Sequence, residues 1–153
     1  MEPNGASKCT YFATYRFGLD DKNRLQVPSK WRSEDPNFQF VVVIWPKQRE
    51  GACLRVMPLE VMNKVAQQLE AMPEDNPNKP SLKRLIGGKA DSFTLDKAGR
   101  ITLPATMIEA AGITGQAVLV GMLDRFEIWN PERYEKVEVS DSVKGEEAFR
   151  MLE

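Results

Sequence analysis

An aspartate followed four residues later by an arginine occurs twice in this chain, inside two polar segments that resemble each other. The two segments are LDDKNRLQVP at residues 19–28 and LDKAGRITLP at residues 95–104. Asp20 can orient Arg24, and Asp96 can orient Arg100, because a carboxylate accepts hydrogen bonds from a nearby guanidinium. A guanidinium held in one orientation can bind guanine O6 and N7, or a phosphate, through two parallel hydrogen bonds. The spacing therefore predicts two fixed arginines that bind nucleic acid.

Each segment also has the composition of a tight turn. Aspartate side chains accept hydrogen bonds from backbone N–H groups two residues further on, which favours turns that begin at Asp20 and Asp96. Gly99 adopts positive φ without a steric cost. Its counterpart in the first copy is Asn23, one of the few other residue types that enter the left-handed region readily. We therefore predict the same backbone turn in both copies.

A single Asp-x-x-x-Arg pattern is weak, because such a pair can also serve only to brace a hairpin. Duplication and basic surroundings favour a binding role. Basic residues outnumber acidic ones by six to two between residues 8 and 32, and by five to two between residues 81 and 100. Lys22 and Lys97 lie at or beside the two turn tips and extend this positive charge. The net charge of −1 argues against non-specific binding to polyanions, but it leaves room for a local basic face.

The two segments belong to a longer internal repeat. Five residues of the first copy recur 76 positions later: Phe17, Leu19, Asp20, Arg24 and Pro28 match Phe93, Leu95, Asp96, Arg100 and Pro104. In the same register, VVVI at residues 41–44 aligns with AVLV at residues 117–120. After a slip of a few residues, LRVMPLEVMNKV at 54–65 aligns with FEIWNPERYEKV at 126–137. Such self-similarity predicts two copies of one structural unit.

Each copy predicts the order strand, tight turn, strand, short helix, strand, strand, helix. RLQVP and RITLP alternate with a period of two, as half-buried strands do. Pro28 and Pro104 end these strands and can open a helix, and Gly112 suits the left-handed residue after a helix end. Each apolar run is a buried strand that can form a hairpin with the alternating strand after it. Pro58 and Pro131 then open the last helix of each unit.

These elements predict an α+β fold that is rich in β-strands. We assign residues 11–71 to a first unit with its helix, 72–86 to a proline-rich linker, 87–137 to a second unit with its helix, and 138–153 to a C-terminal tail. A unit of this size buries too little apolar surface to be stable alone. We therefore expect the two units to pair across a pseudo-twofold axis and to share one β-rich core.

The composition excludes several classes of protein. The chain has 153 residues, of which 42% are hydrophobic and 28% charged, as in a soluble globular protein. It contains no histidine, which removes Ser-His-Asp and Cys-His catalysis and histidine metal sites. Cys9 and Cys53 form no close pair, so a reducing cytoplasm is the simplest compartment. No apolar run reaches the roughly 20 residues of a membrane span. We expect no enzyme activity, cofactor, metal site, membrane partner or small-molecule substrate.

The segments FGLDDKNRLQVPSKWR and FTLDKAGRITLPATMIEAAGI, followed by VLVGMLDRFEIWNPERYE, resemble the two halves of the MraZ family of bacterial transcriptional regulators. The resemblance covers about residues 11–134. It implies two tandem AbrB-like swapped-hairpin units that form a pseudo-twofold β-barrel core with flanking short helices. It also implies a ring homo-oligomer, in the cytoplasm or on the nucleoid. Such a ring would bind short direct repeats in double-stranded DNA upstream of its own division and cell-wall operon, and we expect it to act as a repressor.

The resemblance also assigns roles to the residues of the two turns. The DNA-binding residues are Arg24 and Arg100, with Lys22 and Lys97 nearby, and the loop-orienting residues are Asp20, Asp96, Asn23 and Gly99. The family usually has glycine where Asn23 and Ala13 stand in this chain. Lys30 and Arg32, on the short helix that follows RLQVP, either contact phosphate or lie on a solvated helix face.

Two other function classes remain as alternatives. An antitoxin-like or scaffold module would use the same fold to hold a protein partner. Such modules usually carry a disordered partner-binding tail after one DNA-binding half, whereas here a second copy of the unit occupies that region. An enzyme ranks last, because no histidine is present and the adjacent carboxylates Asp20 and Asp21 would point apart on an extended strand.

Overall fold

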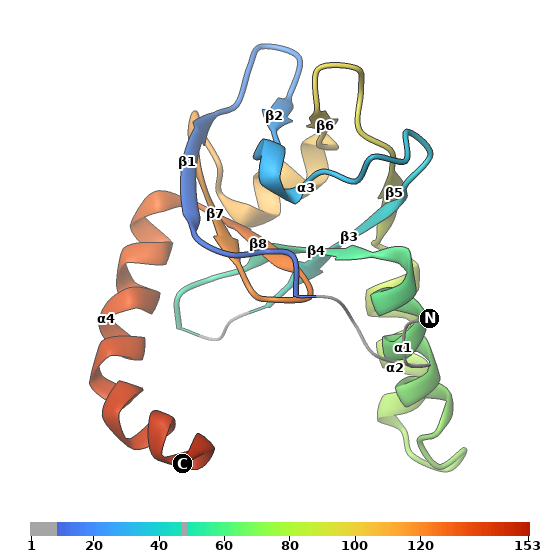
Figure 1. Ribbon diagram of the computed structural model, residues 1–153. Coiled ribbons are helices and arrows are strands. Elements are labelled where there is room, and N and C mark those ends of the chain that lie inside the picture. Colours follow the sequence, from blue (N-terminus) through green and yellow to red (C-terminus); the bar gives the residue numbers. More distant parts are fainter. Residues whose placement is uncertain (1–8, 47–48) are drawn as a thin grey trace.

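The computed structural model describes residues 9–46 and 49–153 of the chain (Figure 1). The first repeat contains β1 (Thr14–Gly18), β2 (Arg24–Gln26), η1 (Ser29–Trp31), β3 (Phe40–Trp45), β4 (Cys53–Pro58) and α1 (Leu59–Glu70). The second repeat contains β5 (Asp91–Phe93), β6 (Arg100–Thr102), α3 (Ala105–Ala111), β7 (Gln116–Gly121), β8 (Phe126–Trp129) and α4 (Pro131–Phe149). Between them lies α2 (Asn78–Gly87), and η2 (Arg150–Leu152) follows α4. The predicted order of elements is therefore found in both copies.

The strands form two antiparallel sheets. Six of them make one sheet in the order β1-β7-β8-β4-β3-β5, and β2 pairs with β6 in a separate two-stranded sheet. The order of the large sheet is symmetric about the β8–β4 pair, so equivalent strands of the two repeats occupy equivalent places. The α+β class is confirmed. The expected β-barrel core is not found as a closed barrel, because in the described part of the chain β1 and β5 are the edges of an open six-stranded sheet.

The two repeats are interlocked through their leading strands. β1 of the first repeat pairs with β7 of the second, with Arg16 opposite Val118. β5 of the second repeat pairs with β3 of the first, with Val41 opposite Ser92. Neither leading strand pairs with a strand of its own repeat, so each repeat completes the sheet of the other. This arrangement gives the two small units the common core that neither could build alone.

The main core lies between one face of the large sheet and the layer formed by the β2–β6 pair, η1 and α3. Leu25, Trp31, Ile101, Met107 and Phe126 are among its buried members, each no more than 2% exposed. The short helices begin after Pro28 and Pro104, as predicted, and α3 ends at Gly112, which has a φ of 68°. The core therefore covers the inner face of the β2–β6 pair and leaves the outer face to solvent.

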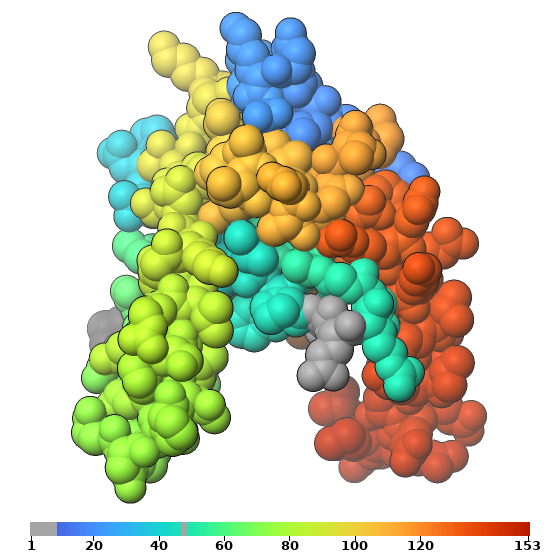
Figure 2. Space-filling model, turned by 180° about the vertical axis from the view of Figure 1, so that it is seen from behind, coloured from blue at the N-terminus to red at the C-terminus, as the bar shows by residue number. Residues whose placement is uncertain are grey.

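The opposite face of the large sheet is flanked by two helical arms. α1 and α2 form one arm and α4 forms the other, and both extend away from the β2–β6 end of the molecule (Figure 1). Figure 2 shows from behind that the turns before β2 and β6 make one end of the surface while the arms make the other. None of the helices in residues 9–46 and 49–153 has the length and apolar content needed to span a bilayer.

The predicted linker, residues 72–86, contains most of helix α2. The prolines that identify this stretch as a linker do not prevent the helix, because Pro80 lies in the first turn of α2, where its missing N–H costs nothing. Lys79 is buried and donates hydrogen bonds to the carbonyl oxygens of Glu70 and Met72, both 3.1 Å away, and to the Glu74 carboxylate. The predicted tail, residues 138–153, continues α4 and ends in η2.

Candidate nucleic-acid interface

The turn of the first hairpin, residues 20–23, is closed by the side chain of Asp20. Its Oδ1 accepts hydrogen bonds from the backbone N–H groups of Lys22, at 2.9 Å, and Arg24, at 2.8 Å. The backbone N–H of Asn23 also donates to the carbonyl oxygen of Asp20. Asn23 has a φ of 62°. The predicted aspartate-closed turn with a left-handed residue is therefore confirmed for what we call the first tip.

The second tip, residues 96–99, repeats this geometry. Asp96 Oδ1 accepts hydrogen bonds from the backbone N–H groups of Ala98 and Arg100, both at 2.9 Å. Gly99 donates its N–H to the carbonyl oxygen of Asp96 and has a φ of 79°. Asparagine and glycine thus support the same backbone turn in the two copies.

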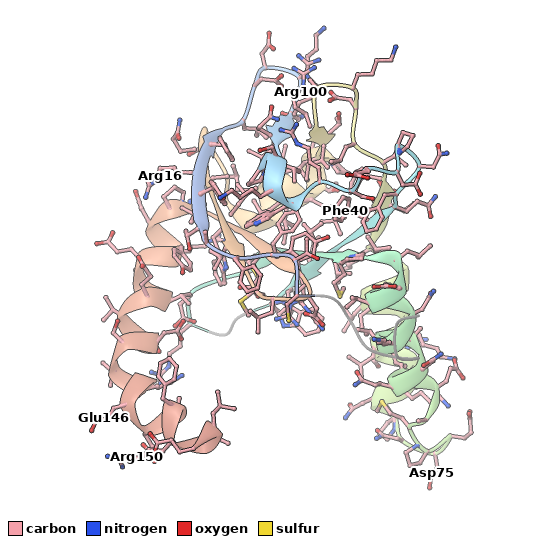
Figure 3. The ribbon with its side chains drawn as sticks, in the orientation of Figure 1. Arg16, Phe40, Asp75, Arg100, Glu146 and Arg150 are labelled. Atoms are coloured by element: carbon pink, nitrogen blue, oxygen red, sulfur yellow. The ribbon has the colours of Figure 1, made fainter. Side chains whose placement is uncertain are left out.

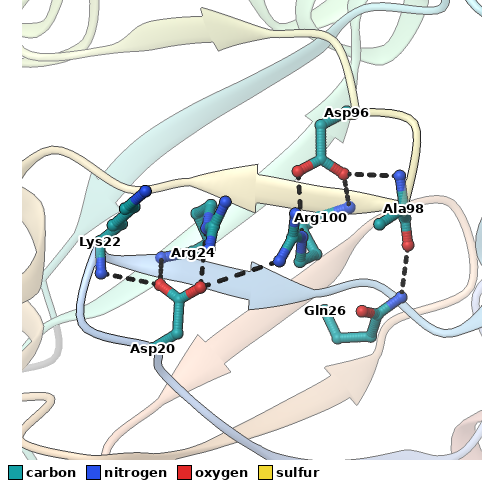
Figure 4. A network of polar contacts seen from close by, with 7 residues as sticks. All are labelled: Asp20, Lys22, Arg24, Gln26, Asp96, Ala98 and Arg100. Carbon is teal, nitrogen blue, oxygen red and sulfur yellow. Dashed lines mark hydrogen bonds and ion pairs between the residues drawn. The ribbon is translucent and has the colours of Figure 1, made fainter.

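Each aspartate also holds the guanidinium of its own arginine. Arg24 Nε donates to Asp20 Oδ2 at 2.7 Å, and Arg100 Nε donates to Asp96 Oδ2 at 3.0 Å (Figure 4). The arginine side chains remain 29% and 31% exposed. Because only Nε is used in these bonds, the two terminal nitrogens of each guanidinium keep N–H groups for an external acceptor.

The two arginines lie on one surface because their strands pair with each other. In the β2–β6 ribbon, residues 24–26 and 100–102, Leu25 lies opposite Ile101 and both are buried. The alternation of a strand then places four residues on the outward face: Arg24, Gln26, Arg100 and Thr102. Arg24 lies opposite Thr102, and Arg100 lies opposite Gln26.

The two aspartates do not make the same contacts with the arginines. Asp20 Oδ2 also lies 3.9 Å from a terminal nitrogen of Arg100, so Asp20 contacts both arginines. Among the described residues, Asp96 forms an ion pair only with Arg100. Gln26 Nε2 donates to the carbonyl oxygen of Ala98 at 3.0 Å and so ties the ribbon to the second tip (Figure 4).

The hydrogen bonds of the tips also fix the charge of the aspartates. The backbone N–H of Arg24 is the largest cause that holds the pKa of the Asp20 carboxyl below its usual value, against a smaller opposing effect of desolvation. The backbone N–H of Arg100 lowers the pKa of Asp96 in the same way. Both carboxylates are therefore ionised at neutral pH and keep their hold on the arginines.

Lys22 and Lys97 lie on the exposed tips, as predicted. Neither forms an ion pair with another residue of the part that the structure describes. The ammonium groups of both lysines are therefore available to an anion. With Arg24 and Arg100 they place four cationic side chains at the end of the molecule opposite the helical arms, and Figure 3 shows Arg100 there, far from Asp75 and Glu146.

Arg32 packs against the second tip, a contact that neither of the two roles expected for it from the sequence included. Its Nε donates to the carbonyl oxygen of Val27 at 2.9 Å, and its guanidinium lies against Gly99, where any Cβ would overlap it. Val27 in turn donates its N–H to the carbonyl oxygen of Gly99. The repeat places Ile108 at the position equivalent to Arg32, so the first tip lacks this neighbour. The sequence signal for this contact was the difference between Asn23 and Gly99, because the first tip accommodates a side chain at that position and the second tip does not.

The site has the features of a binding surface. Beside the second tip is an open pocket of about 580 Å³ whose lining includes Arg32, Asp35, Asp96 and Lys97. Within residues 9–46 and 49–153, no group of three or more His, Cys, Asp or Glu side chains could hold a metal ion. The exposed guanidinium and ammonium groups are instead suited to phosphate oxygens and to base edges.

Comparison with known proteins relates the chain to one family. A family described as "MraZ protein, putative antitoxin-like" matches residues 86–150. A protein of Idiomarina loihiensis named "Transcriptional regulator MraZ" is 36% identical over 88% of this chain and 90% of its own length. Proteins with the same name are 35% identical in Clostridium acetobutylicum, over 86% of this chain and 88% of theirs, and 33% identical in Acidithiobacillus ferrooxidans, over 80% and 83%.

Proposed function

The chain belongs to the MraZ family, and we propose that it is a transcriptional regulator that binds specific DNA sequences through the β2–β6 ribbon and its two tips. The observation that carries this proposal is the pair of equivalent arginines, each held by its own aspartate, on the outward face of a two-stranded ribbon. The major groove of B-form DNA admits a two-stranded β-ribbon. Arginine that binds guanine O6 and N7 is the commonest specific contact there.

The residues of the site divide into two groups by what they can contact. Arg24 and Arg100 lie on the ribbon and contact guanine edges in the groove. Lys22 and Lys97 project from the tips and contact the phosphates on either side, which positions the ribbon but carries no sequence information. Asp20 and Asp96 keep the arginine side chains in one orientation before DNA arrives, which lowers the entropy cost of binding.

One chain offers few phosphate contacts, because the near-neutral chain brings only two lysines of the site, Lys22 and Lys97, to the phosphates. Useful affinity therefore requires several subunits on several sites, since each bound subunit raises the effective concentration of the next. A ring homo-oligomer on short direct repeats upstream of its own division and cell-wall operon, in the cytoplasm or on the nucleoid, fulfils this requirement. Binding at that place would act as repression.

An antitoxin-like role is the second candidate, and α4 gives it an observation of its own. Val139, Val143 and Phe149 on this helix are 63%, 82% and 72% exposed, which is unusual for apolar side chains of a folded helix. A protein partner seated on α4 would cover them. A partner that copurifies with the wild-type chain and is lost from a Val143→Glu variant would support this role.

The proposal is tested by titrating the wild-type protein onto a fluorescent duplex from the region upstream of its own gene, with a shuffled duplex of the same length as control. We expect tight binding to the upstream duplex alone. The logarithm of the binding constant should fall linearly with the logarithm of salt concentration, by about 0.9 per phosphate contact. Equal binding to both duplexes, or an affinity that does not change with salt, would contradict the proposal.

A further inference from the structure

A regulator that binds direct repeats must distinguish the two orientations of a DNA element. The pseudo-twofold axis of this chain exchanges Arg24 with Arg100, because their strands pair antiparallel about Leu25 and Ile101. The two strands of a duplex are related by similar twofold axes. A ribbon that carried only the two arginines would therefore bind an element equally well in either direction.

The outward face of the ribbon contains one further pair of equivalent positions, and its members differ. Gln26 and Thr102 occupy matching places in the two repeats, 76 residues apart. Gln26 lies beside Arg100 across the ribbon, and Thr102 lies beside Arg24. The tips differ as well, with Lys22 in one and Lys97 in the other, but phosphate contacts carry no sequence information. Of the residues on the outward face of the ribbon, Gln26 and Thr102 are therefore the pair that can relate the orientation of the protein to the order of the bases.

The two side chains also suit different bases. A glutamine amide reads adenine by accepting a hydrogen bond from N6 and donating one to N7, whereas a threonine methyl packs against the methyl group of thymine. Gln26 Nε2 already donates one N–H to the carbonyl oxygen of Ala98, at 3.0 Å. Its second N–H and its oxygen remain for a base, so the amide is held in place before DNA arrives. Thr102 is exposed and makes no side-chain hydrogen bond to another described residue.

We infer that Gln26 and Thr102 are the specificity-determining residues that set the orientation of the DNA element, with Gln26 reading adenine beside one guanine and Thr102 contacting thymine beside the other. This inference rests on the proposed function, because it assumes that the ribbon lies in the major groove. In this account the arginines recognise guanine, and Gln26 and Thr102 determine the direction in which each DNA element is bound.

The test is a complete set of single-base substitutions in the upstream duplex, titrated with wild type, Gln26→Ala, Thr102→Ala and the exchange variant Gln26→Thr/Thr102→Gln. Gln68→Ala, an exposed glutamine on α1, is the matched control. We expect Gln26→Ala to lose about tenfold to a hundredfold discrimination at one A·T pair, with an unchanged salt slope and unchanged preference for guanine. Thr102→Ala should lose less, at a different pair, and the control should behave as wild type.

The exchange variant gives the sharper outcome, since a purely structural role could not produce it. It should prefer the element in which the adenine read by Gln26 and the thymine contacted by Thr102 are interchanged, which is the element read in the reverse direction. If wild type binds the upstream duplex specifically but Gln26→Ala and the exchange variant keep the wild-type base profile, the inference is overturned while the proposed function stands. If wild type itself shows no specific binding, it is the proposed function that fails.

Discussion

Two pairs of equivalent residues lie on the pseudo-twofold axis, one in the β2–β6 ribbon and one in the large sheet, and they differ in kind. At the solvent-exposed end, equivalent residues Leu25 and Ile101 pair in the β2–β6 ribbon. At the buried end, equivalent residues Arg55 and Glu127 pair between β4 and β8. The exposed end therefore carries like residues on the axis, and its neighbouring arginines are the same in both repeats, whereas the buried end carries opposite charges.

Burial explains this difference. Arg24 and Arg100 are partly exposed, and each has its own aspartate, so two like charges near the axis are tolerated. Arg55 and Glu127 are only 14% and 7% exposed, and their side chains form an ion pair at 3.2 Å. Two arginines or two glutamates there would leave a buried charge without a partner, which costs several kcal/mol.

The surroundings of the buried pair have been adapted to each charge. The Arg55 guanidinium carbon lies 3.8 Å from the centroid of the Trp45 ring, and Glu127 Oε1 accepts a hydrogen bond from Trp129 Nε1 at 3.0 Å. A homodimer of identical chains cannot place complementary residues on its own axis. Two repeats in one chain can, and here they keep the same two arginines on the β2–β6 ribbon and differ at the buried Arg55–Glu127 pair.

The largest expected effect concerns the buried end of the axis. Glu127→Ala should lower the free energy of unfolding by about 3–5 kcal/mol, because it leaves the Arg55 charge buried and unpaired. The double variant Arg55→Leu/Glu127→Leu should recover most of this loss. Urea unfolding measures both. A loss below about 1 kcal/mol in the single variant would show that the pair does not stabilise the centre of the sheet.

The second prediction compares the two tips. Gly99→Ala should cost about 2–3 kcal/mol, from the left-handed backbone and from loss of the Arg32 hydrogen bond to Val27 when the guanidinium is displaced. Asn23→Ala should cost about 1 kcal/mol or less, since a Cβ is already accommodated at the first tip. Thermal unfolding of both variants checks this. Equal losses would mean that Arg32 does not brace the second tip.

The third prediction separates the two aspartates by DNA affinity. Asp20→Asn should weaken binding to the upstream duplex by about fivefold, and Asp96→Asn by less, because Asp20 contacts both arginines. The lowered pKa of each carboxyl sets the pH dependence of stability. Stabilisation by these groups is complete above the ordinary aspartate pKa of 3.8 and is lost as pH falls through the lowered values. These two groups should therefore contribute no change in the free energy of unfolding between about pH 5 and 8, and each Asn variant should lose the decrease that its aspartate contributes in acid. A larger loss of DNA affinity for Asp96→Asn than for Asp20→Asn would contradict the claim that Asp20 orients both arginines.

The parts of the site that the sequence predicted are those with local causes. The Asp20 and Asp96 turns, the positive φ of Asn23 and Gly99, and the helix that starts at Pro131 depend on hydrogen bonds and sterics within a few residues. The repeat extended this reasoning to the order of all strands. Local patterns therefore predicted both Asp–Arg pairs and the strands that carry them.

The features that the sequence did not predict arise from contacts between distant segments. The contact of Arg32 with Gly99 and the Arg55–Glu127 pair join residues about 70 positions apart, which spacing alone cannot relate. The open edges of the large sheet, found in place of a closed barrel, depend on how β1 and β5 are placed by tertiary packing. Helix α2 was missed because the buried ammonium of Lys79, which stabilises it against α1, is a tertiary contact of a residue type that is usually exposed.

The most direct measurement of the central claim is the affinity of Arg24→Ala and Arg100→Ala for the upstream duplex, beside Arg150→Ala as control. Arg150 has the same spacing from Glu146 and a similar ion pair, at 3.2 Å, but lies at the opposite end of the molecule (Figure 3). We expect each ribbon variant to bind about tenfold to a hundredfold more weakly, with unfolding midpoints close to wild type and no change for the control. Wild-type affinity in a folded Arg24→Ala protein would contradict the claim that the ribbon arginines read DNA.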